Sequence, residues 1–354
     1  ENFNYLFLSQ RLISLLLNLI RNPMLKVVKI TILSLFSSIY LIAQDHDFNE
    51  ENALFSEGKY SAAQFLYQSI IANDISNETA HYYNAKCSKE LFSLDAVFLY
   101  EQFLLDFPFT SFKNEVSEDL ALLYFRETSY PKAITYLLQL ENLEEYPHLI
   151  FKLAYANFSI DSLVAAQYYF SKLLNTESKY AATSQYYSAY IAYQNGLYKT
   201  ALNGFRYLIS NEQFGAIVPY YITQIYFFQK SYTELISFAS PLIEGVIPSR
   251  KAEVNRLLAE AYYRTEDYEK AIIHFNAYLE EREQVNPIVH FLLGQSYFKI
   301  NEYENAINHL EKVSNTSDSI SQHATYCLGA SYLQLDQYNY ALQAFKKSAT
   351  YTYD

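Results

Sequence analysis

The chain has 354 residues, 51% of them hydrophobic, and its 38 acidic and 26 basic side chains give a net charge of −12. Binding to a phosphate backbone depends on clustered Lys and Arg, so this balance argues against nucleic acid as a partner. Gly occurs only 7 times and Pro only 8 times, which argues against a β-rich or loop-rich fold.

The first segment, residues 1–23, precedes Met24, the single methionine of the chain. We interpret it as upstream translation that is not part of the mature protein. The alternative is a membrane hairpin formed by two apolar stretches. Arg11 within the first stretch and Arg21 between the two argue against that hairpin, because charged side chains are costly inside a bilayer.

The next segment, residues 24–44, has the layout of a secretory signal peptide. Two lysines give it a positive start, and an apolar run follows over residues 30–42. That run is short for a membrane span. We expect cleavage after Ala43 or Gln44 and export to the periplasm or beyond. Contact with a membrane is expected only through this segment, if it is not cleaved.

One pattern recurs through the rest of the chain. A clear copy consists of Leu293, Tyr297, Tyr303, Ala306 and Leu310, separated by steps of 4, 6, 3 and 4 residues. Steps of 3 and 4 place side chains on one face of a helix, and the step of 6 spans a polar turn. Each copy therefore predicts two short amphipathic helices folded back on each other.

Small residues occupy fixed places within the copies. Gly or Ala stands at positions 259, 294 and 329 in the first helix, and Ala stands at positions 271, 306 and 341 in the second. We expect the two helix backbones to approach closely at these positions, because a packed interior tolerates little added volume.

The second-helix position recurs at intervals of 33 to 37 residues over residues 45–354. The nine anchors are Ala63, Ala96, Ala133, Ala166, Ala201, Leu235 (a substituted member), Ala271, Ala306 and Ala341. The pattern resembles the tetratricopeptide repeat, whose period is 34 residues. The resemblance implies an all-α fold, a right-handed superhelical solenoid of about nine helix-turn-helix repeats. Repeat arrays generally end in a polar capping helix, and the last residues of this sequence show no evident one. The array could therefore also continue beyond Asp354.

Motifs that carry chemistry are absent from the sequence. It contains no phosphate-binding Gly-rich loop and no His-Glu-x-x-His pattern, and Cys87 and Cys327 lack metal-ligand spacing. We therefore predict no enzyme, no catalytic residue, no cofactor and no metal, and we interpret both cysteines as free thiols.

The tetratricopeptide resemblance also implies that the first helix of each repeat lines a concave groove. Counting back from the anchors gives a set of aromatic groove residues. They are Phe151, Tyr155, Phe158, Tyr186, Tyr190, Tyr193, Tyr220, Phe227, Phe228, Phe291 and Phe298. Exposed aromatic surface of this kind favours a protein or peptide segment as the partner. The alternative is that these rings pack between neighbouring first helices.

Charged residues interrupt the aromatic positions in the seventh repeat, at Glu253, Arg256, Glu260 and Arg264. A carboxylate clamp for peptide ends, known in some members of the family, is disfavoured. Lys89 and Lys299 match one of its positions, but Ala85 and Gln295 stand where Asn is expected.

A second resemblance concerns the stretch that begins at Tyr100. Its Phe103, Phe107-Pro108 and Leu123-Tyr124 are similar to a segment of tetratricopeptide proteins of the Gram-negative envelope. We therefore expect an exported scaffold for protein–protein interaction in cell-envelope assembly or maintenance. The alternatives are a glycan-binding helical protein, and the sensor part of a longer protein with a downstream domain.

Overall fold

The computed structural model describes residues 48–282, 284–313 and 319–350. Every regular element in these ranges is a helix, so the all-α prediction is confirmed. The predicted upstream segment and signal peptide, residues 1–23 and 24–44, lie outside the described residues. The described chain divides into two compact units, which meet in sequence at Glu141 and Asn142.

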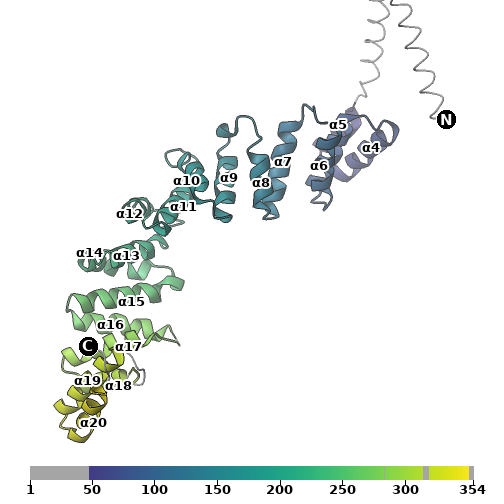
Figure 1. Ribbon diagram of the computed structural model, residues 1–354. Helices are drawn as coiled ribbons and strands as arrows, with labels where there is room; N and C mark the ends of the chain where they lie inside the picture. Colours follow the sequence, from purple (N-terminus) through teal and green to yellow (C-terminus); the bar gives the residue numbers. More distant parts are fainter. Residues whose placement is uncertain (1–47, 283, 314–318, 351–354) are drawn as a thin grey trace, which may run out of the picture. The chain divides into compact units, whose positions relative to one another are not determined.

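The helices follow one another as pairs joined by short turns (Figure 1). The first unit contains α3 (Asn49–Ser56), α4 (Tyr60–Asn73), α5 (Glu78–Glu90), α6 (Ala96–Asp106), α7 (Lys113–Arg126) and α8 (Tyr130–Leu137). The second unit contains η2 (Leu143–Glu145), α9 (Pro147–Ser159), α10 (Leu163–Ser171), α11 (Ala181–Gln194), α12 (Tyr198–Tyr207), α13 (Val218–Phe228), α14 (Tyr232–Ala239), η3 (Ser240–Gly245), α15 (Pro248–Arg264), α16 (Tyr268–Glu280), α17 (Pro287–Lys299), α18 (Tyr303–Leu310), α19 (Ser319–Gln334) and α20 (Tyr338–Ser348).

All nine anchor residues lie in the second helix of a pair, and none is more than 3% exposed. The residue four positions later packs beside the anchor on the same helix face. In the first two pairs it is Tyr67 and Tyr100, both fully buried. Each pair thus buries one apolar stripe of its second helix against its first helix and the neighbouring pair, which is the packing that holds a repeat array together.

The turn between the helices of each pair contains a residue with left-handed backbone conformation. Only two of these nine residues are glycine; the others include Thr128, Lys230 and Asp336, with φ of 58°, 57° and 59°. The next residue then donates its backbone N–H to the carbonyl five residues earlier, as Glu302 does to Tyr297 over 2.9 Å. This bond satisfies one of the free carbonyl groups at the end of the first helix.

The close approach predicted at the small residues is confirmed at two glycines. A Cβ atom added at Gly294 would lie 2.8 Å from Cγ of Leu310, and one added at Gly329 would lie 2.9 Å from ring atoms of Phe345. In both pairs the partner side chain comes from the second helix, four residues after the anchor. A bare backbone in the first helix is what lets that side chain pack there.

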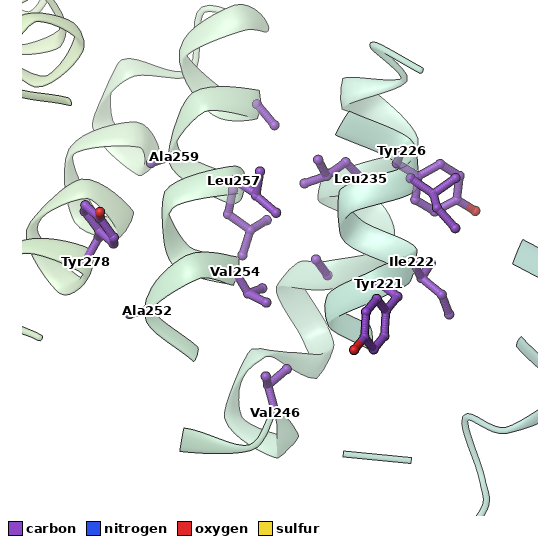
Figure 2. Packing of buried hydrophobic residues seen from close by; sticks show 14 of the residues in the cluster. Tyr221, Ile222, Tyr226, Leu235, Val246, Ala252, Val254, Leu257, Ala259 and Tyr278 are labelled. Atoms are coloured by element: carbon purple, nitrogen blue, oxygen red, sulfur yellow. The ribbon is translucent and has the colours of Figure 1, made fainter. Parts of the chain in front are cut away.

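The largest core cluster belongs to the second unit and runs from α11 to α17. Figure 2 shows its central part, with Ile222 of α13, Leu235 of α14 and Leu257 of α15, which all belong to this cluster. Leu235, the substituted anchor, is fully buried like the alanines. Leu is larger than Ala, and at this anchor it packs in the same buried cluster as residues of α13 and α15.

The first unit contains a buried ion pair. Asp119 is 7% exposed, and its two carboxylate oxygens accept hydrogen bonds from Lys89 Nζ and Tyr100 Oη, each over 2.6 Å. Burial acts to lower the pKa of Lys89, but its bond to Asp119 outweighs that effect and the net shift is upward. Lys89 is therefore held within the fold by its bond to Asp119.

Candidate functional site

The eleven predicted groove residues all lie on first helices of the second unit. Phe151, Tyr155 and Phe158 are on α9, and Tyr186, Tyr190 and Tyr193 are on α11. Tyr220, Phe227 and Phe228 are on α13, and Phe291 and Phe298 are on α17.

The structure brings the rings of α9, α11 and α13 into one continuous series, which we call the aromatic ladder. Phe158 of α9 contacts Tyr190 of α11, with ring centroids 6.1 Å apart. Tyr190 stacks on Tyr193 at 6.4 Å, and Tyr193 stacks on Phe228 of α13 at 6.4 Å. Aromatic pairs at such distances stabilise one another, so the three helices are joined by ring contacts.

Phe291 and Phe298 are not part of the ladder. Helix α15 lies between α13 and α17 in sequence and contacts both of them. Phe298 makes its edge contact with Tyr303 of its own pair, at 5.7 Å. The predicted stripe therefore ends at α13, where the charged positions of α15 begin.

The rings of the ladder are partly packed in the core and partly exposed. The two interpretations drawn from the sequence, a binding surface and packing between first helices, are therefore not exclusive. Tyr186 stacks on buried Phe214 at 4.8 Å, and burial raises its pKa. Most of the other rings are half-buried, whereas Phe228 is 51% exposed. Burial also raises the pKa of Tyr193 to about 12. The buried parts of these rings belong to the core, and their exposed parts are accessible to a partner.

A polar chain crosses the ladder between α11 and α13. Tyr193 Oη donates to Gln224 Oε1, and Gln224 Nε2 donates to Tyr220 Oη, each over 2.8 Å. The guanidinium of Arg250 lies over the Tyr220 ring, 4.6 Å from its centroid. These contacts fix the orientation of the two tyrosine rings.

Gln224 and Arg250 were not among the groove residues predicted from the sequence, because that prediction used aromatic positions alone. A signal existed for Gln224, because it stands eleven residues before the Leu235 anchor, on the groove face of the first helix. The same arrangement recurs further along the unit, where Tyr263 Oη donates to Gln295 Oε1. Gln295 stands eleven residues before Ala306. In two repeats, a glutamine at this position thus accepts a hydrogen bond from a tyrosine of the preceding repeat.

Charged side chains on α15 pair with one another next to the ladder. Arg256 donates to Glu253 through Nε over 3.1 Å and also pairs with Glu260. Burial raises the pKa of Glu260, and its pairing with Arg256 only partly offsets that effect. The Arg256 guanidinium is 5.9 Å from the centroid of the Phe227 ring. The aromatic ladder ends at these charged residues. Because they are already paired with one another, they do not form a site for a charged ligand.

The described part of the chain offers no obvious metal or membrane site. No group of three or more His, Cys, Asp or Glu side chains in it is placed to hold a metal ion. None of its helices is long and apolar enough to cross a membrane. Cys87 is buried and Cys327 is half-buried, and both are free thiols.

One family model matches the chain. It is described as anaphase-promoting complex, cyclosome, subunit 3, and it covers residues 228–313, from the end of α13 into the segment after α18. No curated protein matches the chain.

Several solved structures are similar. The C-terminal part of a TPR repeat-containing protein from Cytophaga hutchinsonii is 18% identical and covers 66% of this chain and 94% of its own, with a TM-score of 0.46. A tetratricopeptide repeat protein from Parabacteroides merdae is 17% identical and covers 70% of this chain and 96% of its own, with a TM-score of 0.39. MamA of strain MSR-1 is also 17% identical and covers 48% of this chain and 96% of its own, with a TM-score of 0.40.

These scores are too low for an argument on their own, and the repeat itself carries the assignment. Each of the nine described helix pairs has a buried anchor at the expected place, and the intervals between anchors are those of a 34-residue repeat. With the family match over residues 228–313, these features identify the chain as a tetratricopeptide-repeat protein.

Proposed function

We propose that this protein is an exported scaffold that binds a segment of another protein along the aromatic ladder. The observation that carries the proposal is the continuous ring series on α9, α11 and α13, which ends in the exposed ring of Phe228. Repeat arrays of this class bind proteins or peptides through extended surfaces on their helices.

The chemistry of the ladder fits a polypeptide. Its phenyl faces offer apolar area, while Tyr190, Tyr193 and Tyr220 add hydroxyl groups that can bond to a peptide backbone. The bonds through Gln224 fix the orientation of Tyr193 and Tyr220 before binding, so these two side chains have little freedom left to lose.

Export and a cell-envelope role are further parts of the proposal. They are supported by the signal-peptide layout of residues 24–44 and by the resemblance of the stretch from Tyr100 to envelope tetratricopeptide proteins.

A crosslinking pull-down from envelope fractions tests the binding surface. The full chain serves as bait beside Phe228→Ser, which removes the most exposed ring of the ladder. The matched control is Tyr207→Ser on α12, a 75% exposed ring on a second helix. We expect a specific protein to be recovered with wild type and with Tyr207→Ser, and to be lost with Phe228→Ser.

Equal recovery of the partner protein with all three baits would contradict the proposal and would indicate that the ladder rings serve packing only. Recovery of a glycan in place of a protein would favour the carbohydrate-binding alternative.

A further inference from the structure

Successive repeats of the second unit meet at joints, where the second helix of one repeat packs on the first helix of the next. Three positions of the repeat pattern lie at each joint. One directly follows the anchor of the earlier repeat, and two stand 17 and 13 residues before the anchor of the next. At four joints within the described residues of this unit, all three positions are apolar and belong to or pack against a buried cluster. These sets are Leu202, Val218 and Ile222; Ile236, Val254 and Leu258; Ile272, Val289 and Leu293; and Ile307, Ala324 and Leu328.

The joint between α10 and α11 is polar at all three positions. Gln167 follows the Ala166 anchor, and Ser184 and Ser188 stand 17 and 13 residues before the Ala201 anchor. Ser184 is fully buried, and Ser188 is 5% exposed. Gln167 Oε1 and the two serine hydroxyl oxygens are buried and have no hydrogen-bond partner within the described ranges. Such atoms are rare in native proteins, because a buried polar atom without a partner is costly.

The hydrophobic core is also divided at this joint. Ala189 and Ala192 of α11 belong to the largest cluster of the unit, whereas Ile191 of α11 belongs to a separate cluster with Phe170 of α10. Helix α11 packs tightly on its own partner α12, since a Cβ added at Gly204 would lie 2.7 Å from Cβ of Ala189. A separation of the array at α11 would therefore leave α11 with α12 and release α10.

Opening has opposite consequences at the polar joint and at the apolar joints. At the polar joint, water reaches Gln167, Ser184 and Ser188 and supplies the hydrogen bonds that they lack in the closed state. At the other four joints, opening exposes valine, leucine or isoleucine side chains to water, which is unfavourable. Tyr187 of α11, which stacks on Phe170 of α10 at 5.2 Å, stabilises the closed state of the polar joint.

We propose that the second unit opens at the joint between α10 and α11 more often than at its four apolar joints. Helices α9 and α10 then move away from α11 and the helices that follow it. The aromatic ladder crosses this joint, because Phe158 of α9 contacts Tyr190 of α11. Opening divides the ladder, and this consequence for binding rests on the proposed function, whereas the opening itself does not.

Thiol labelling of the full chain without a partner tests the proposal. Ser184→Cys and Val254→Cys are introduced together, at equivalent positions that are both fully buried in the closed structure. Both changes nearly keep the side-chain volume, so the fold is retained. Peptide mass spectrometry distinguishes the two new thiols from Cys87 and Cys327, and each labelling rate is divided by its value in denaturant. We expect labelling at position 184 to be at least about tenfold faster than at position 254.

Two further changes test whether polarity is the cause. Gln167→Leu/Ser188→Ala removes the other polar groups of the joint, so it should slow labelling at position 184 about tenfold and leave position 254 unchanged. Ile236→Gln places an amide at the position equivalent to Gln167, where the isoleucine is half-buried. It should accelerate labelling at position 254 and leave position 184 unchanged.

Equal labelling rates at positions 184 and 254 would overturn the proposal, because unfolding of the whole unit exposes both thiols alike. An unchanged rate at position 184 in Gln167→Leu/Ser188→Ala would refute the polar groups as the cause of opening. These rates are measured on the chain alone, so they stand whether or not a partner binds the ladder.

Discussion

Glycines in the first helices determine how closely the two helices of a pair can approach. The Cβ of any other residue at Gly294 would lie 2.8 Å from Leu310 Cγ and 3.3 Å from the carbonyl oxygen of Ala306. Leu310 is fully buried, so a shift of its side chain would have to displace packed neighbours. The constraint is therefore steric and local to one pair of helices.

We predict that Gly294→Val lowers the free energy of unfolding by about 2 kcal/mol or more, because overpacking outweighs the better helix propensity of valine. Urea denaturation followed by circular dichroism measures the change. Gly245→Val is the control, since nothing lies within 4 Å of a Cβ at Gly245. A loss of equal size in both variants would mean that close approach is not the cause.

A histidine pair in the second unit makes stability depend on pH. Nδ1 of His290 on α17 lies 3.2 Å from Nδ1 of His309 on α18, and His309 stacks on Tyr297. Burial lowers the pKa of both rings, with a further contribution from the positive charge of Lys312, and the pKa of His309 falls to about 4. The folded state thus binds fewer protons than the unfolded state between pH 6.5 and about 4.

We expect the free energy of unfolding to be at its full value above pH 6.5 and to fall as the pH is lowered toward 4. Replacing His309 with Phe keeps the stacking and removes one titrating group, so the slope in this window should decrease. Urea unfolding at several pH values measures the slope, with His323→Phe at an exposed position of α19 as the control. An unchanged slope in His309→Phe would refute this assignment.

At the scale of the element, most turns within the helix pairs use a non-glycine residue in left-handed conformation. A side chain in this conformation costs roughly 1–2 kcal/mol relative to glycine. Lys230, with φ of 57°, is exposed and joins α13 to α14. The hydrogen bond from Ser231 N to Tyr226 O, over 2.9 Å, keeps this turn in place.

Lys230→Gly should raise the free energy of unfolding by about 0.5–1 kcal/mol, since relief of the strain exceeds the added chain entropy of glycine. Lys230→Ala removes the same side chain but keeps the strain, and its stability should stay near the wild-type value. Thermal unfolding compares the two. A stabilisation of the same size in Lys230→Ala would show that backbone strain is not the source.

The helix pairs were predictable because the anchors are apolar, mostly small and evenly spaced, and because the same stripe recurs in every pair. The left-handed turns were not, since residues such as Thr128 and Lys230 have no preference for that conformation. The tyrosine positions on α11 were predicted, but their division between core and surface was not. That division depends on Phe214, which packs on Tyr186 from the segment after α12.

A pocket between α4, α5 and α6, with Asn84 among its lining residues, had no signal in the sequence. Its residues come from three helices, and nothing in the repeat pattern distinguishes Asn84 from an ordinary polar position. For the bond between Tyr193 and Gln224, the sequence places Gln224 on the groove face but does not indicate its partner, which is 31 positions away. Contacts of this kind depend on the rotation of each helix, which spacing alone does not determine.

For the whole molecule, the proposal combines export with binding. We predict that residues 24–44, fused to a phosphatase that is active only outside the cytoplasm, give phosphatase activity in a Gram-negative host. The positive start of the segment should be required, so Lys26→Glu/Lys29→Glu should lower that activity strongly. An inactive wild-type fusion would contradict export through this segment.

The central claim is that a partner polypeptide lies on the aromatic ladder, and in-cell photocrosslinking tests it most directly. A photoreactive phenylalanine analogue is placed at Phe228 in one strain and at Tyr207 in another, both exposed aromatic positions of the second unit. The account predicts a discrete crosslinked protein from position 228 and none from position 207. The same products at both positions, or none at position 228, would contradict it.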